Sequence, residues 1–121
     1  MDEKRILIVD DDEIFLKMLQ NTLTSSGYSV SMATNGKDAI DVAKHWHPHL
    51  IILDVMMPEM DGGETASALE RDPTTENIPI IFMTSLLNKE DEDKLTYSQK
   101  RSYMAKPYNK DELLIEIAKK L

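Results

Sequence analysis

Apolar residues follow two patterns along the chain. Short runs rich in β-branched residues are typical of buried strands, and they alternate with stretches whose apolar residues recur every three or four positions, as in amphipathic helices. The predicted strands are Ile6–Val9, Tyr28–Ala33, Leu50–Leu53, Ile78–Met83 and Tyr103–Ala105. The first, third and fourth are continuously apolar, which indicates central strands of a parallel sheet. The second alternates Tyr28, Val30 and Met32 with serines, which indicates a half-exposed strand at an edge.

Helical patterns lie between the strands. Gly27 ends the first helix, Asn35-Gly36 opens the second, and Asn109 caps the last with the Asn-x-x-Glu spacing of a capping box. A further helix over residues 86–99 rests on propensity, because its apolar face is thin. The predicted buried faces are Phe15, Leu16, Leu19 and Leu23; Ala39, Ile40 and Ala43; Ala66 and Leu69; and Leu113, Ile117 and Leu121 with Leu114 and Ala118 beside them.

Five strands alternating with five helices predict an α/β fold, a doubly wound five-stranded parallel sheet of the flavodoxin-like (βα)5 type. Strand order 2-1-3-4-5 is expected because it leaves the alternating second strand at an edge. No linker or repeat interrupts the chain, so residues 1–121 are expected to form one domain.

Composition narrows the class of protein. The chain has 121 residues, of which 41% are hydrophobic and 30% charged, as expected for a soluble globular domain. A net charge of -8 argues against direct nucleic-acid binding, which needs a basic face. The apolar runs are too short to span a membrane, and "MDEKR" has no apolar stretch of a secretory signal. The absence of cysteine excludes disulfides and fits a cytoplasmic location.

Polar residues follow the predicted strands at the points where these strands end. Asp10-Asp11 follow the first, Asp54 the third, Thr84-Ser85 the fourth and Lys106-Pro107 the fifth. The carboxyl ends of parallel strands share one edge of the sheet, where ligands bind in such folds. The sequence therefore predicts one pocket lined by acidic side chains, a hydroxyl and an ammonium group.

Carboxylates crowded at this edge need compensation. Neighbouring charges among Asp10, Asp11 and Asp12 repel each other by about 3 kcal/mol at roughly 5 Å and an effective dielectric constant near 20. Mg²⁺ prefers such oxygen ligands and would offset the repulsion. The lysine and the hydroxyl suit a phosphoryl group, and an aspartate can itself become an aspartyl phosphate.

The stretches "ILIVDDDE", "IILDVMMPEMDG", "IIFMTS" and "YMAKPY" resemble the sequence blocks of response-regulator receiver domains of two-component signalling, in the same order. The resemblance implies that Asp54 is the phosphoacceptor of a phosphorelay. It implies that Asp11 binds Mg²⁺ directly, that Asp10 assists, often through water, and that the backbone carbonyl of Met56 completes the protein's metal contacts.

The same resemblance assigns the remaining site residues. Thr84 is similar to the switch hydroxyl that contacts the phosphoryl group, and Lys106 to the lysine that pairs with it. Pro107 is expected to follow a cis peptide bond, and Tyr103 to be the switch aromatic that moves inward with Thr84. The donor would be a sensor histidine kinase or a histidine phosphotransfer protein. The face formed by the fourth helix, fifth strand and fifth helix would contact a downstream partner.

Some features depart from the family pattern. Lys100 and Arg101 stand where small residues are common, and residues 90–93 form an acidic run. Both lie near the expected output face, so they bear on the partner and leave the phosphorylation chemistry unchanged. The segment "HWHPH" is interpreted as a helix terminus, because its spacing does not bring three histidine side chains together on a helix.

Other functions remain open from the residues alone. A phosphatase of the haloacid-dehalogenase type would need an acidic residue two positions after its nucleophile, where this chain has Met56, and a nucleophile on the first strand. A receiver-like docking module without phosphorylation would be expected to lose part of the acidic pocket, and this chain keeps all of it. The chain is compatible with a stand-alone regulator or with a receiver from a longer protein.

Overall fold

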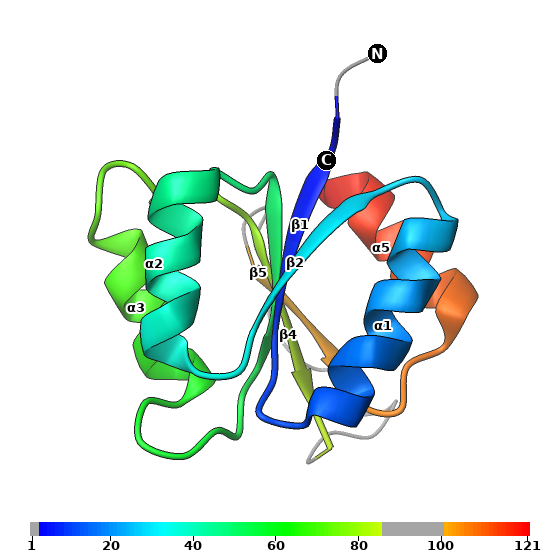
Figure 1. The fold of residues 1–121 in the computed structure, drawn as a ribbon, viewed down its shortest axis with the longest axis horizontal. Coiled ribbons are helices and arrows are strands. Elements are labelled where there is room, and N and C mark those ends of the chain that lie inside the picture. Colours follow the sequence, from blue (N-terminus) through cyan, green and yellow to red (C-terminus); the bar gives the residue numbers. More distant parts are fainter. Residues whose placement is uncertain (1–2, 86–100) are drawn as a thin grey trace.

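A computed structural model describes residues 3–85 and 101–121. Its strands and helices are β1 (Arg5–Val9), α1 (Glu13–Ser25), β2 (Ser29–Ala33), α2 (Gly36–Trp46), β3 (Leu50–Asp54), α3 (Gly62–Glu70), β4 (Ile80–Thr84), β5 (Arg101–Ala105) and α5 (Lys110–Lys120). Strands and helices alternate along the chain from β1 to β4 (Figure 1). The helix expected over residues 86–99 lies outside the described residues.

The five strands form one parallel sheet in the order β2-β1-β3-β4-β5, which confirms the predicted fold class and strand order. Helices α1 and α5 cover one face of the sheet, and α2 and α3 cover the other (Figure 1). None of the helices in the described part of the chain has the length and apolar character needed to cross a bilayer.

Each face of the sheet buries its own apolar core, because successive strand residues point to opposite faces. Ile6 and Ile8 of β1 pack with the apolar residues of α1 and α5. Leu7 and Val9 pack with those of α2 and α3. Burial on both faces explains why β1, β3 and β4 read as unbroken apolar runs.

The ends of some elements differ from the sequence-based predictions. Strand β4 begins at Ile80 and not at Ile78, since the Ile78 N–H closes a turn onto the Thr75 carbonyl (3.1 Å) and Pro79 has no N–H to donate. Strand β2 does lie at an edge of the sheet, but its Met32 side chain is exposed rather than buried.

The helix predictions hold in part. The Asn35 and Asn109 side chains accept hydrogen bonds from Asp38 N (2.8 Å) and Glu112 N (2.9 Å), so both caps are confirmed. Within α5, Leu113 and Ile117 are buried and Leu114 packs beside them, half-buried. Residues 118 and 121 are exposed because the helix ends at Lys120, beyond the edge of the core, so the prediction of Leu121 as a buried residue was wrong.

The histidine-rich segment forms the end of α2, as predicted. His47 is the C-cap and adopts the left-handed conformation with φ 52°. Arg5 of β1 donates from its guanidinium to the His47 carbonyl (2.8 Å), and the Arg5 backbone N–H donates to Nδ1 of His49 (3.0 Å). The segment therefore ties α2 to the start of β1 through the backbone carbonyl of His47 and the side chain of His49.

Replacing His47 by glycine is expected to stabilise the protein. A left-handed residue with a Cβ costs roughly 1–2 kcal/mol, and the flexibility of glycine in the unfolded chain cancels part of the gain, which leaves about 0.5–1 kcal/mol. Urea unfolding of His47→Gly against the wild type measures this difference. Ser26→Gly is the control, because Ser26 caps α1 with φ -93° and gains nothing from glycine. An equal gain in both variants would contradict the assignment of strain to His47.

Candidate functional site: an acidic pocket at the carboxyl edge of the sheet

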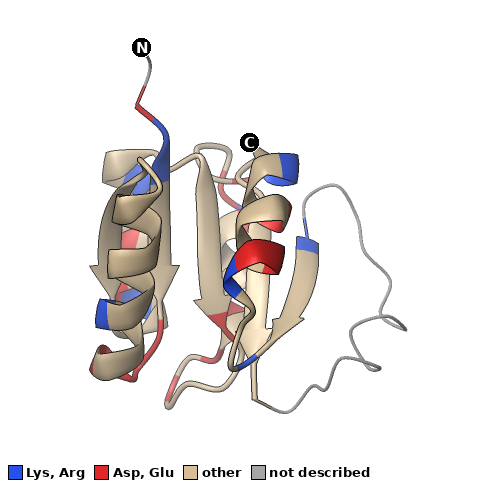
Figure 2. Cartoon of the chain, turned by 90° about the vertical axis from the view of Figure 1, so that its right-hand side faces the viewer, with Lys and Arg blue, Asp and Glu red and all other residues tan. Residues whose placement is uncertain are grey.

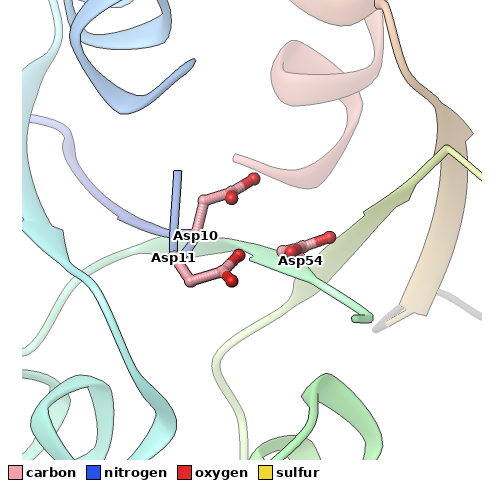
Figure 3. A group of neighbouring side chains, drawn as sticks. All are labelled: Asp10, Asp11 and Asp54. Carbon is pink, nitrogen blue, oxygen red and sulfur yellow. The ribbon is translucent and has the colours of Figure 1, made fainter. Parts of the chain in front are cut away.

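Two neighbouring strands bring three carboxylates together. Asp10 and Asp11 follow β1 directly and Asp54 ends β3, and the β1–β3 register pairs Val9 with Leu53. Each aspartate offers one oxygen, and these oxygens all lie within 4.8 Å of one another (Figure 3). Asp10 and Asp54 are only 2% and 5% exposed, whereas Asp11 is open to solvent. In Figure 2, red segments, which mark Asp and Glu, lie in the loops beyond the strand arrowheads.

The third aspartate of the run has a different role. The Asp12 side chain accepts hydrogen bonds from the backbone N–H groups of Ile14 (3.0 Å) and Phe15 (3.2 Å), and so caps α1. The Asp12 N–H in turn donates to Oδ1 of Asp10 (2.9 Å). The backbone N–H groups at the start of α1 therefore bind the Asp12 carboxylate, and the Asp12 N–H helps to hold the carboxylate of Asp10.

Lys106 supplies the positive charge of the pocket. Its Nζ lies 2.5 Å from Oδ2 of Asp10 and 3.4 Å from Oδ1 of Asp54, and 4.4 Å above the centre of the Phe15 ring. Burial lowers the pKa of Lys106, but the hydrogen bond and charge of Asp10, followed by those of Asp54, outweigh burial and raise it. The ammonium group is thus held charged between the two buried carboxylates.

The pKa of the Asp54 carboxyl is shifted above its ordinary value. Burial, followed by the negative charge of Asp10, raises its pKa from 3.8 to about 6, against the opposing effects of Lys106 and of the Met56 N–H. One ammonium group therefore does not fully compensate two buried carboxylates. The remaining negative charge makes the pocket receptive to a cation.

Three other predicted residues lie at or just after strand ends, on the same edge of the sheet. Thr84 ends β4, is buried and pairs with Ala105 in the sheet. The Met56 N–H lies 3.4 Å from Oδ1 of Asp54, while its side chain is exposed. The Lys106–Pro107 peptide bond is cis.

Tyr103 lies farther from the carboxylates, on β5. Its ring stacks on Phe82 with centroids 5.0 Å apart and an interplanar angle of 16°. Phe82 also lies 5.5 Å below the guanidinium of Arg101, whose Nε and Nη2 form a bidentate pair with Glu70 at the end of α3 (2.8 and 2.6 Å). This pair, which the sequence did not predict, ties α3 to β5 beside the predicted switch aromatic.

Phe15 is a site residue that the sequence reasoning missed. Its position on the helical face of α1 identified it only as a core residue, yet it packs on Lys106 and edge-on against Tyr108 at 6.0 Å. A signal was available, because Phe15 lies in the first turn of a helix that starts at the acidic edge of the sheet.

The donor set fits a hard divalent cation. Carboxylate oxygens from Asp10, Asp11 and Asp54 are the ligands that Mg²⁺ prefers, and it commonly retains water beside one or two carboxylates. The adjacent lysine and buried threonine hydroxyl are groups that suit an anion with several oxygens. Fold and site together define a protein of the doubly wound α/β class with an acidic pocket at the carboxyl edge of its sheet, lined by groups that suit a cation.

The comparisons with known proteins narrow this class. The family model described as "Response regulator receiver domain" matches residues 6–118. Polar-differentiation response regulators DivK of Brucella ovis and Brucella anthropi are each 33% identical over 104 residues, covering 86% of this chain and 85% of theirs. The chain therefore belongs to the response regulator receiver domain family and acts in two-component signalling.

Solved structures agree with this membership. Chemotaxis protein CheY4 of Vibrio cholerae superimposes with a TM-score of 0.86 at 28% identity, covering 99% of this chain and 100% of that chain. The signal receiver domain of a signal transduction histidine kinase from Syntrophus aciditrophicus gives 0.82 at 31% identity, covering 98% and 89%. Chains of this fold thus occur both in chemotaxis regulators and within a kinase.

Without metal, Asp54→Asn is expected to stabilise the protein near neutral pH. The folded form holds the Asp54 proton more tightly than the unfolded form does. The protonated Asp54 carboxyl therefore contributes its full stabilisation below about pH 3.8, and this stabilisation is lost as the pH rises through about 6. The neutral amide of Asp54→Asn should therefore raise the free energy of unfolding by up to about 3 kcal/mol at pH 7.5 and by little at pH 4. Urea unfolding in a chelator at both pH values measures this gain.

The control for this prediction is Asp41→Asn, which removes the same charge from an exposed position on α2. Its effect on the free energy of unfolding should be small at both pH values. A gain for Asp54→Asn that is absent at pH 7.5, or that is as large at pH 4, would show that burial of the ionised carboxylate is not the cause.

Proposed function

We propose that Asp54 accepts a phosphoryl group from a sensor histidine kinase or a histidine phosphotransfer protein, in a reaction that depends on Mg²⁺. One observation carries this proposal. Asp54 is the buried carboxylate at the end of β3, with oxygens of Asp10 and Asp11 within 4.8 Å and the Lys106 ammonium at 3.4 Å. A nucleophile, a cation site and a counter-charge for a phosphoryl group are therefore within reach of one another.

In the transfer, an Asp54 oxygen attacks phosphorus while the phosphorus–nitrogen bond of the donor phosphohistidine breaks. The electron pair of that bond leaves with the imidazole nitrogen, which takes up a proton, and an acyl phosphate remains on Asp54. Hydrolysis would return the carboxylate by attack of water on the same phosphorus. The chain would thus catalyse its own phosphorylation and dephosphorylation and turn over no metabolite.

Mg²⁺, held by Asp10, Asp11, Asp54 and the backbone carbonyl of Met56, would neutralise charge that accumulates on the phosphoryl oxygens. Lys106 already contacts the Asp54 carboxylate, so its ammonium group is in position to pair with an added phosphoryl oxygen.

The conformational response would run through β4 and β5. Thr84 would move its hydroxyl toward the phosphoryl group, and Tyr103 would follow inward along the same face of the sheet, which Phe82 shares. Phosphorylation would favour one of two pre-existing arrangements. The downstream partner would bind the face formed by the fourth helix, β5 and α5, of which the fourth helix lies outside the described residues. We expect this signalling to take place in the cytoplasm.

The rival functions have less support. A haloacid-dehalogenase-type phosphatase would use an acidic side chain at position 56, but the exposed thioether of Met56 cannot move a proton. A docking module would not need two buried carboxylates paired with a half-buried lysine.

Phosphorylation by acetyl phosphate with Mg²⁺ tests the acceptor. Intact-mass measurement should show one phosphoryl group on the wild type, none on Asp54→Asn, and a reduced amount on Lys106→Ala, because the ammonium group neutralises phosphoryl oxygens. Lys119→Ala, at an exposed position of α5, should be labelled like the wild type. Undiminished labelling of Asp54→Asn would refute the assignment, and rapid turnover of phosphate esters would favour the phosphatase.

Thermal unfolding tests the cation site. A cation that binds only the folded form at tenfold its Kd stabilises the protein by about 1.4 kcal/mol, which raises Tm by about 5 °C for a domain of this size. Asp11→Asn should lose most of this rise. Asp12→Asn makes the same charge change one residue along and keeps a side chain able to cap α1, so it should respond to Mg²⁺ like the wild type. If Asp11→Asn responds normally, Asp11 is not a metal ligand.

A further inference from the structure

The first residue of α3 packs directly on the backbone that carries the phosphoacceptor. A Cβ added to Gly62 would lie 2.8 Å from the Cα of Val55 and closer still to the carbonyl oxygen of Asp54. Both obstacles are main-chain atoms at the end of a central strand, so they cannot turn aside as a flexible side chain does. Only glycine allows this approach without moving the end of β3.

The close approach is used by a chain of hydrogen bonds. The Gly62 N–H donates to the Val55 carbonyl (3.0 Å), and the Val55 N–H donates to the Met83 carbonyl of β4 (3.1 Å). Val55 is therefore held on one side by α3 and on the other by the sheet. Met56, whose N–H faces the Asp54 carboxylate at 3.4 Å, is the next residue along this fixed backbone.

We propose that Gly62 is a positioning residue for the cation site: its missing side chain lets the start of α3 clamp Val55, and this clamp sets where the Met56 carbonyl stands relative to Asp54. The inference rests on the proposed function, in which that carbonyl contacts Mg²⁺. Groups that orient metal ligands from behind commonly change metal affinity by about 10- to 100-fold when they are altered.

Gly36 provides a matched control elsewhere in the fold. It too is buried at the first residue of a helix, and an added Cβ would lie 2.8 Å from the Met60 sulfur and closer still to Oγ1 of Thr65. Its obstacles are the side chains of Met60, just before α3, and of Thr65 on α3, and none belongs to the backbone around Asp54. Alanine at either glycine disturbs tight packing, but only at Gly62 does it press on the site.

The experiment is a calorimetric titration of the wild type, Gly62→Ala and Gly36→Ala with Mg²⁺ alone, together with urea unfolding of each. Gly62→Ala is expected to raise the Kd for Mg²⁺ about tenfold or more. Gly36→Ala should lose stability while it binds Mg²⁺ almost as the wild type does. In NMR spectra without metal, the amide signals of Val55 and Met56 should shift in Gly62→Ala and stay in place in Gly36→Ala.

A second pair of variants tests the clamp if Gly62→Ala does not fold. Asp61 caps α3 by accepting a hydrogen bond from the Glu64 N–H (2.8 Å), within a capping box. Asp61→Ala and Asp61→Ser both remove the charge, but only serine keeps a cap. Asp61→Ala should therefore bind Mg²⁺ several-fold more weakly than Asp61→Ser, since the start of α3 is then less firmly held.

The outcomes distinguish a failure of the positioning role of Gly62 from a failure of the cation site itself. If the wild type and Gly62→Ala bind Mg²⁺ equally well, the positioning role of Gly62 is overturned and the cation site is not. The same holds if Gly36→Ala loses as much Mg²⁺ affinity as Gly62→Ala does. Where Gly62→Ala does not fold, equal affinities of Asp61→Ala and Asp61→Ser overturn it. A wild type that does not bind Mg²⁺ overturns the cation site and the positioning role together.

Discussion

The structure depends on the burial of two carboxylates at one edge of the sheet. Asp10 and Asp54 end up beside each other because β1 and β3 are adjacent, parallel and in register. Lys106 reaches both from the end of β5, yet one ammonium group leaves the pocket with an excess of negative charge. Burial, followed by the negative charge of Asp10, raises the pKa of Asp54, and the excess negative charge is the physical reason why a cation suits this place.

The surrounding elements hold this unfavourable arrangement in place. The third aspartate of the run, Asp12, caps α1, and the ring of Phe15 packs on the ammonium group of Lys106. On the opposite face of the sheet, α3 contacts the end of β3 through Gly62 and reaches β5 through the Glu70–Arg101 pair. One helix thus touches both the strand of the proposed phosphoacceptor and the strand of the predicted switch aromatic, so a structural change at one strand has a short path to the other.

Much of the fold and most of the site could be predicted from the sequence. Strands buried on both faces have a distinct apolar pattern, and the rule that parallel strands share a carboxyl edge was enough to group Asp10, Asp11, Asp54 and Lys106. The failures came where local and tertiary effects compete. Ile78 continued an apolar run but closes a turn before Pro79, and Leu121 continued a helical stripe beyond the end of the core.

By itself, the sequence determined which chemistry was available and at which edge of the sheet, because residue type and strand order follow from local pattern and chain connectivity. Only the tertiary structure decided how the charges are shared. It assigned Asp12 to the helix and Asp10 to the pocket, set Lys106 between two carboxylates, and placed Gly62 against the backbone of Asp54. These outcomes depend on distances of a few ångströms between segments far apart in the chain, and no pattern of neighbouring residues encodes them.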